Sequence, residues 1–406
     1  MVTSTIGRDI FIGRQPIYNR RLECIGYELL YRAGDVQHAC VSDGTQASSE
    51  VILHAFLDMG LQNLVGKRVA FIKLPRNLLL SQLCTLLPPG AVWLEIQGNS
   101  VVDDEMLKTV RELHSRGYRI ALDDYLSYEQ LQPLVGLADI VRIDVSQLRA
   151  VDLAAHLAEV RPYPGKLLAE KVENREQFRT CAAAGFEYFQ GFFLCRPDVV
   201  KGGRLPPSRA AALQLLKQVN DPVIDVRELA KIIRRDPSLT HRMLRAINSA
   251  GMAVSQTVES VDDALLLLGM DYVAKLASLV VLAGVDDQPR ELLTTAMVRA
   301  RMCELLGAAA GKEHAGTLFL VGMYSAMDAM MGITMETVLG QVPLAPKVRA
   351  ALVAQEGFLG EVLHCVLAFE RGDWAAVEAS ALGPGAIQQS YLQALAWSGE
   401  MVGRIG

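Results

Sequence analysis

Short apolar runs alternate with longer amphipathic stretches in the first half of this 406-residue chain. The runs are rich in β-branched and aromatic residues and have the length of strands. Segments with helical periodicity separate most of them; residues 104–117, for example, repeat apolar side chains at Met106, Val110 and Leu113 and end at Gly117. Such alternation predicts a parallel sheet. The eight predicted strands span residues 10–18, 24–32, 68–74, 91–97, 119–125, 140–145, 167–172 and 187–194.

Acidic residues at the ends of these strands indicate how the sheet closes. They are Glu28, Glu95, Asp123, Asp124, Asp144, Glu170 and Glu173. In a (β/α)8 barrel the C-terminal ends of the strands meet at one mouth, where the chemistry takes place. An open doubly wound sheet is the alternative, but it usually carries a Gly-rich phosphate loop after its first strand, and this sequence has none. The pattern therefore favours an α/β fold of the TIM-like (β/α)8 type.

The pattern changes after about residue 200, where glycines and prolines over residues 202–207 mark a junction. Beyond it the chain reads almost entirely as helices rich in Ala and Leu. Asp221-Pro222 and Asp236-Pro237 predict helix starts, with the acid as the cap and the proline in the first turn. The expected domains are a barrel, residues 1–200, and an all-α domain, residues 201–406.

Composition narrows the class of partner and the compartment. The formal net charge of -5 argues against a nucleic-acid surface, which normally shows a basic excess. The seven cysteines form no C-x-x-C pair, so we expect reduced thiols in a cytoplasmic protein. Residues 264–283 form the most membrane-like run, but Asp271 and Lys275 within it favour a buried helix pair over a membrane span. We therefore expect a soluble protein without a membrane partner.

The converging carboxylates can be explained in two ways. Acids gathered at one barrel mouth repel one another, and a divalent metal would offset that repulsion. Two such ions about 3.5–4 Å apart would suit the hydrolysis of a phosphodiester. A rim of salt bridges would account for the same residues, so the pattern leaves both explanations open.

Six segments, in order, resemble the EAL family of cyclic di-GMP phosphodiesterases over about 190 residues. RQPIYNRRLECIGYELLYR resembles the opening hairpin of the family. VWLEIQ, GYRIALDDY, ADIVRID and LLAEKVEN resemble successive strands of its barrel. FEYFQGFFLCRP resembles its Q-G-Y-x-[FL]-x-[RK]-P signature. The resemblance implies a barrel that hydrolyses cyclic di-GMP with the help of divalent metal.

The resemblance also implies a role for each matching residue. The implied metal ligands are Glu28, Glu95, Asp123 and Asp124. The implied contacts to the dinucleotide are Gln15, Arg32, Gln190 and Arg142. Glu170 would help to activate the attacking water or bind a second metal.

Departures from the family pattern indicate that hydrolysis is weak or lost. Lys73 stands where the family has a metal-binding Asn, and a protonated Lys cannot ligate a divalent ion. We expect its ammonium to pair with Glu28 and Asp123 in place of a metal, or else to extend into solvent. Arg142 replaces a lysine and cannot act as a general base. The glycine-containing loop after the double Asp is reduced to DDYLSYEQL, and Lys171 replaces the glycine of A-E-G-V-E.

The helical half resembles HDOD domains, which are relatives of the HD metal phosphohydrolases. The match begins with LLKQVNDPVIDVRELAKIIRRDPSLTHRMLRAINSA and continues through residues 258–283. Where catalytic HD domains carry a metal-binding His-Asp doublet, this chain has Ser325 and Ala326, so we expect no hydrolase site there. An EAL-like barrel followed by HDOD is the architecture of the YuxH-like EAL-HDOD bacterial signalling proteins.

The leading hypothesis is a bacterial signal-transduction protein with a degenerate EAL domain and an HDOD regulatory or protein-interaction domain. It implies no cofactor, weak binding of cyclic di-GMP and protein partners through either domain, and it leaves a homodimer open. The alternative is an active cyclic di-GMP phosphodiesterase that uses Mg²⁺ or Mn²⁺. Nucleic-acid binding by the basic segment at residues 231–245 is less favoured, because helical spacing makes a solvated face the simpler interpretation.

Overall fold

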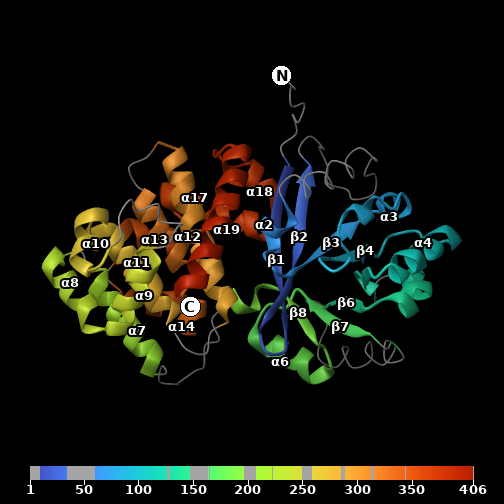
Figure 1. Ribbon diagram of the computed structural model, residues 1–406, viewed down its shortest axis with the longest axis horizontal. Helices are drawn as coiled ribbons and strands as arrows, with labels where there is room; N and C mark the ends of the chain where they lie inside the picture. The colour runs from blue at the N-terminus through green and yellow to red at the C-terminus, as the bar shows by residue number, and fades with distance from the viewer. Residues whose placement is uncertain are drawn as a thin grey trace. The chain divides into compact units, whose positions relative to one another are not determined.

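The computed structural model describes residues 10–33, 60–125, 129–146, 163, 165–195, 207–221, 223–248, 258–284, 289–311, 315–342 and 344–405. The chain forms two compact units (Figure 1). The first comprises residues 1–193 with 370–372, and the second comprises residues 194–369 with 373–406. The domain boundary expected at residue 200 stays a prediction, because residues 196–206 lie outside the described part of the chain.

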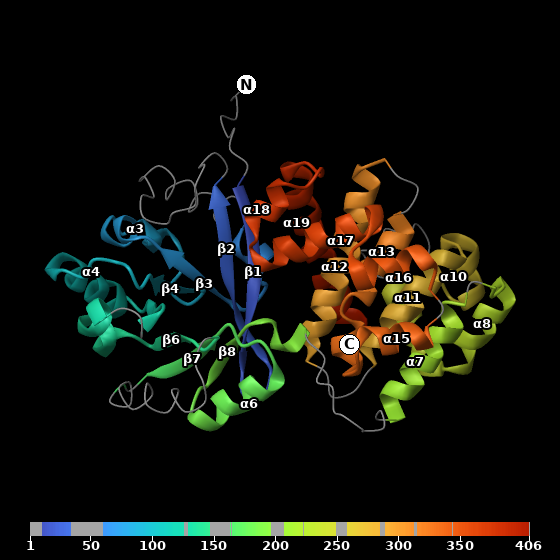
Figure 2. The same cartoon turned by 180° about the vertical axis from the view of Figure 1, so that it is seen from behind.

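Eight strands close into a barrel in the first unit (Figures 1 and 2). Strands β2 to β8 are each parallel to the next, whereas β1 is antiparallel to both β2 and β8. The eight predicted strands are confirmed, and the first two pair as a hairpin. The strands are β1 Ile10–Asn19, β2 Cys24–Ala33, β3 Val69–Leu74, β4 Val92–Ile96, β5 Arg119–Leu122, β6 Ile140–Asp144, β7 Lys166–Glu170 and β8 Tyr188–Gln190.

Short helices connect these strands. Asp103 caps the longest of them, and its carboxylate accepts a hydrogen bond from the Met106 amide at 2.9 Å. The predicted apolar face of this helix, with Val110 and Leu113, is buried. The α-helices described in this unit are α2 Leu61–Val65, α3 Arg76–Leu80, α4 Asp104–Ser115 and α6 Arg175–Ala184. The 3-10 helices are η1 Leu83–Leu86, η3 Glu129–Leu137 and η4 Phe192–Cys195.

The last strand is shorter than predicted, because Gly191 ends it. Its φ of 146° is open to glycine, and a Cβ at this position would lie 2.2 Å from the Val172 carbonyl oxygen. The Val172 amide donates to the Gln190 carbonyl oxygen at 2.9 Å, and the Phe193 amide donates back to the Val172 carbonyl oxygen at 3.1 Å. These bonds replace the sheet ladder and fix Gln190 at the end of β8.

The second unit is built from helices, as predicted. Buried residues between positions 212 and 342, joined by Met401, form one core, in which Met243, Val280, Met297 and Met323 are almost fully covered. The helices are α7 Pro207–Val219, α8 Val226–Arg235, α9 Pro237–Ile247, α10 Val261–Leu268, α11 Met270–Ala283, α12 Arg290–Ala309, α13 Ala315–Tyr324, α14 Met327–Met331, α15 Met335–Gln341, α16 Pro346–Ala354, α17 Gly357–Arg371, α18 Trp374–Glu378 and α19 Pro384–Ile405.

One of the two predicted Asp-Pro helix starts is confirmed. Helix α9 begins at Pro237, and the carboxylate of Asp236 accepts from the Leu239 amide at 3.0 Å. The other start is wrong, because the Asp221 carboxylate accepts from the Val223 amide in a turn and α8 begins later, behind its own cap Asp225. An Asp-Pro pair can therefore initiate a turn as readily as a helix.

The membrane-like run at residues 264–283 forms the predicted helix pair, since α10 and α11 meet at Gly269, whose φ is 80°. Within the described residues, Pro346–Arg371 alone is long and apolar enough, by length and composition, to span a membrane. Gln355 adopts a left-handed conformation and separates this stretch into α16 and α17. A single stretch of this kind is weak evidence for a membrane span, because the buried core helices of soluble proteins can be equally long and apolar.

The contact between α12 and α13 gives the first testable prediction. A Cβ on Gly322 would lie 2.3 Å from the Arg299 carbonyl oxygen and 2.6 Å from the Ala300 Cα. We expect Gly322→Ala to lower the free energy of unfolding by about 1–3 kcal/mol, because the helices must separate. Gly340→Ala is the matched control, since a Cβ there meets open space. Urea unfolding of both variants checks this, and equal stability would contradict the close contact.

Candidate functional site

The side chains inside the barrel lie in layers. An apolar layer contains Ile17, Phe71, Ala121, Ile140 and Leu168. Because alternate residues of a strand share a face, the residue two positions further along each parallel strand also points inward. The next layer towards the C-terminal ends is therefore polar, and its members are Lys73, Asp123, Arg142 and Glu170.

Arg142 lies at the centre of this polar layer. Its side chain is fully buried, and its Nη2 donates to Glu28 Oε2 at 2.9 Å and to Gln190 Oε1 at 2.8 Å. The same guanidinium donates to Glu95 and to Glu170. These partners come from β2, β4, β7 and β8, so one side chain ties together strands on different sides of the barrel.

Lys73 lies beside this centre, near the opening. Its Nζ is 3.1 Å from Glu28 Oε1 and 3.0 Å from Asp123 Oδ2. The predicted ion pair of Lys73 with both acids is confirmed, and the alternative in which the ammonium leaves the site is not observed. The Lys73 side chain is 34% exposed, whereas the Arg142 side chain is 1% exposed. Lys73 therefore faces the solvent at the mouth, and Arg142 lies deeper in the barrel.

Burial and the neighbouring charges shift the pKa values of the carboxyl groups and of Lys73. Burial raises the pKa of Glu28, but the charges of Arg142 and Lys73 outweigh it and lower that pKa to about 2. Burial and the charge of Glu170 raise the pKa of Asp123 to about 8, in spite of Lys73. Burial lowers the pKa of Lys73, but Glu28 and Asp123 more than reverse this, so the ammonium stays charged.

This arrangement does not fit a divalent ion. Calcium takes six to eight oxygen ligands and Mg²⁺ a near-octahedral set. Here the Glu28 carboxylate oxygens are taken by Lys73, Arg142 and Gln190. Glu95 Oε2 is buried and accepts no hydrogen bond from a described residue, but a single oxygen does not make a ligand shell. Among the described residues, no group of three or more His, Cys, Asp or Glu is placed to hold a metal.

The remaining predicted site residues lie around the cluster. Gln15 accepts a hydrogen bond from Gln190 Nε2 at 3.0 Å and so joins it. Asp124 follows β5 in a left-handed conformation, with a φ of 52°. The pKa of Lys171 is raised mainly by its hydrogen bond to Asp144, and the charge of Asp124 raises it further. The Arg32 side chain and residues 126–128 lie outside the described part. The roles assigned to all these residues stay predictions.

The sequence did not reveal that Arg142 is the centre of the site. The resemblance marked it as a substituted lysine and as a contact to the dinucleotide. A signal was present, however, because Arg142 is the one charged residue within the run IVRI, at an inward position of a buried strand. A buried charge needs partners, so such a position predicts a cluster of acids around it.

In the helical unit, the place where catalytic HD domains carry their His-Asp doublet is the turn between α13 and α14. It contains Ser325 and Ala326, as the sequence indicated. Arg299 is buried and its Nη1 donates to the carbonyl oxygen and to the Oγ of Ser325, both at 3.3 Å. Hydrogen bonds from Arg299 therefore hold this turn. Neither Ser325 nor Ala326 offers the imidazole or carboxylate of the doublet.

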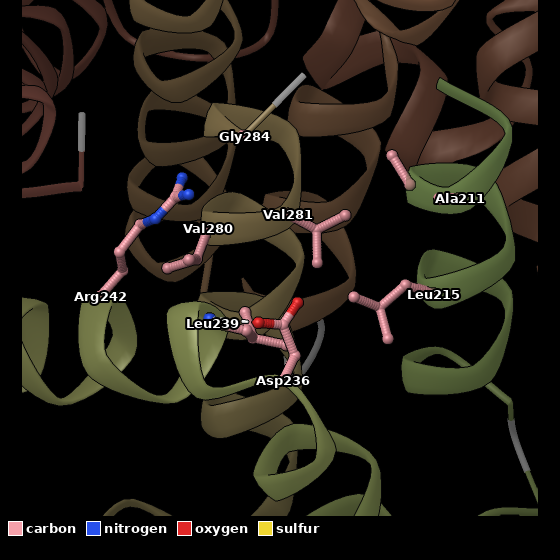
Figure 3. Close-up of a pocket in the computed structure, with 9 residues that line it drawn as sticks. Ala211, Leu215, Asp236, Leu239, Arg242, Val280, Val281 and Gly284 are labelled. Carbon is pink, nitrogen blue, oxygen red and sulfur yellow. Dashed lines mark hydrogen bonds between the residues drawn. The ribbon is translucent and has the colours of Figure 1, made fainter. Parts of the chain in front are cut away.

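Two hollows lie away from the barrel mouth. One, of about 740 Å³, opens at the opposite end of the barrel and is lined by Trp93, Arg119 and Tyr188 among others. The second, of about 170 Å³, lies between α7, α9 and α11 of the helical unit (Figure 3). Leu215 and Val281 form its apolar wall, and Asp236 and Arg242 stand at its sides.

The Arg142 cluster gives a second prediction. Replacing Arg142 with Met leaves the buried carboxylates without their main cation, so we expect a loss of at least about 3 kcal/mol in the free energy of unfolding. Arg119→Met is the matched control; that side chain is 61% exposed and pairs with Asp139 at 2.6 Å, so its loss should cost at most about 1 kcal/mol. Urea titrations decide, and equal losses would show that the cluster is not central to stability.

Lys171 gives a third prediction. It has a φ of 54°, where glycine is unstrained and a Cβ costs roughly 1 kcal/mol. We expect Lys171→Gly to be about 1 kcal/mol more stable than Lys171→Ala. The alanine variant is the control, because both variants remove the ion pair with Asp144. Thermal unfolding measures the difference, and a more stable alanine variant would refute the strain.

Comparison with known proteins identifies both units. The sequence model of the EAL domain family matches residues 73–197, and the sequence model of the HDOD domain family matches residues 205–335. The chain is 31% identical to cyclic di-GMP phosphodiesterase CdgJ of Vibrio cholerae over 96% of this chain and 92% of that protein. It is 27% identical to uncharacterized protein YuxH of Bacillus subtilis over 96% of this chain and 98% of that protein.

Among solved structures, the chain is similar to the Bacillus subtilis YkuI protein, which has an EAL domain and was crystallised with its substrate c-di-GMP and calcium. The identity is 17%, the TM-score is 0.39, and the match covers 56% of this chain and 72% of that one. That likeness is too distant to say more. The Vibrio relative, together with an EAL match followed by an HDOD match, shows that the chain belongs to the family of proteins that join an EAL domain to an HDOD domain.

Proposed function

We propose that this protein transmits a cyclic di-GMP-related signal without hydrolysing the dinucleotide. The EAL barrel would be degenerate, and the HDOD domain would carry the signal to a protein partner. One observation supports this most: the ammonium of Lys73 and the guanidinium of Arg142 are bonded to the carboxylates that a catalytic metal would need.

Electrostatics explains why these cations oppose a metal. Arginine is not deprotonated in proteins, so the positive charge of Arg142 is permanent. Two unit charges about 4 Å apart interact by about 4 kcal/mol at an effective dielectric constant of about 20, so a divalent ion at that distance would be repelled by roughly twice as much. The acids would have to leave Lys73 and Arg142 before they could offset this repulsion.

The proposal still allows a ligand at the mouth. Gln15 is partly exposed there and so is Lys73, so an anionic dinucleotide could bind weakly without metal. No cofactor is required. The free cysteines of the described residues suit the cytoplasm, which is where we place the protein.

A second candidate is an active, metal-dependent cyclic di-GMP phosphodiesterase. The Vibrio relative carries that name and is 31% identical over nearly the whole chain. The acids Glu28, Glu95, Asp123 and Glu170 are also retained and lie together. In this case Mg²⁺ or Mn²⁺ would have to displace the ammonium of Lys73.

A turnover assay distinguishes the two candidates. The full chain is incubated with cyclic di-GMP and Mg²⁺ or Mn²⁺, and the linear dinucleotide is quantified. We expect no product above that formed by Glu28→Ala, because the proposal gives the barrel no hydrolytic activity. We also expect Lys73→Asn to stay inactive, since Arg142 remains in place. Turnover by the unmodified chain that Glu28→Ala abolishes would establish the phosphodiesterase instead.

A further inference from the structure

Helices α8 and α10, together with the turn before α8, expose an unusual amount of apolar surface. Single exposed apolar residues are normal in proteins. Of the seven large apolar side chains that are strongly exposed among the described residues, however, four lie here. They are Val223 at 88%, Val226 at 50%, Leu266 at 87% and Leu267 at 41%. Such a concentration of exposed apolar residues in one part of the chain suggests a binding site for another molecule.

The two helices form one continuous face. They pack side by side in both views of the structure (Figures 1 and 2). Arg234 Nη2 of α8 lies 3.1 Å from Asp262 Oδ1 in the first turn of α10. Leu266 is one turn further along α10, on the same side as Asp262. We call this surface, with Val223 and the exposed residues of α8 and α10, the α8–α10 face.

A row of cations borders the apolar residues. Arg227, Lys231 and Arg235 recur every four residues and are exposed on α8. None of the three makes a hydrogen bond or an ion pair with another described residue. Glu228 is the one acid within α8, so the helix keeps an excess of positive charge although the whole chain is acidic.

We propose that the α8–α10 face binds an acidic amphipathic helix of a partner protein. The apolar stripe of that helix would cover Val223, Val226, Leu266 and Leu267, and its carboxylates would meet Arg227, Lys231 and Arg235. This inference rests on the proposed function, because it names the kind of partner that the HDOD domain would contact.

The charges of the face argue against other occupants. A nucleic acid or an anionic membrane is negative throughout and would also meet Asp262 and Asp263 at the start of α10. A nucleic acid would gain nothing from the exposed leucines. A second copy of the chain would bring Glu228 and Asp263 as its unpaired acids against three unpaired cations. An acidic helix can match both the cations and the apolar residues.

A peptide-binding experiment tests this proposal. The probe is a labelled helical peptide of about 18 residues, with leucines along one side and glutamates beside them. We expect the full chain to bind it at least about tenfold more tightly than a peptide with lysines in place of the glutamates. Lys231→Glu and Leu266→Asp should each weaken binding by about tenfold or more. Lys347→Glu, on α16 of the same compact unit, is the matched control and should not weaken binding.

Other outcomes would overturn the proposal. They are equal affinity for the two peptides, unchanged affinity in Lys231→Glu and Leu266→Asp, stronger binding of duplex DNA or phosphatidylserine vesicles through the same residues, or a dimer in sedimentation that Leu266→Asp dissociates. The peptide is measured without cyclic di-GMP, and turnover is measured without the peptide. A failure of the α8–α10 face is therefore distinguishable from hydrolysis by the barrel.

Discussion

The bonds of the Arg142 guanidinium determine what the barrel mouth can hold. Carboxylates buried away from water are unfavourable unless cations and hydrogen bonds offset the lost hydration. The planar fork of an arginine carries five donors, which lets one side chain reach Glu28, Glu95 and Glu170 together. The acids of this barrel are thus stabilised by the protein's own side chains, and their retention alone does not imply a metal.

The barrel architecture makes this cluster possible. An apolar layer that includes Ile140 and Leu168 supports it from below, and the polar layer lies two residues further along each parallel strand. The short last strand contributes as well, because the turn at Gly191 leaves the Gln190 side chain beside Arg142 and Glu28. Lys73 then covers part of the cluster on the solvent side.

Much of this was predictable from sequence, and what was not has a physical reason. Strand periodicity identified the eight strands, and the acidic residues at the ends of several strands indicated one mouth. Periodicity gives the face of a side chain but not its neighbours across the barrel, so the central place of Arg142 was missed. Backbone conformation was hidden too: Lys171 takes a left-handed φ without being glycine. Asp221 and Asp236 look alike in sequence, yet one forms a turn and the other caps α9.

Manganese binding, followed by the electron paramagnetic resonance signal of the free ion, tests the central claim most directly. The claim is that Lys73 and Arg142 occupy the place of the metal. At about 100 μM protein and Mn²⁺, the unmodified chain should leave the free-ion signal nearly unchanged, since the described residues form no group of three or more acids, histidines or cysteines placed to hold a metal. Removing both cations, in Lys73→Asn with Arg142→Met, should reduce the signal if the chain still folds. Stoichiometric binding by the unmodified chain that Glu28→Ala abolishes would contradict the account.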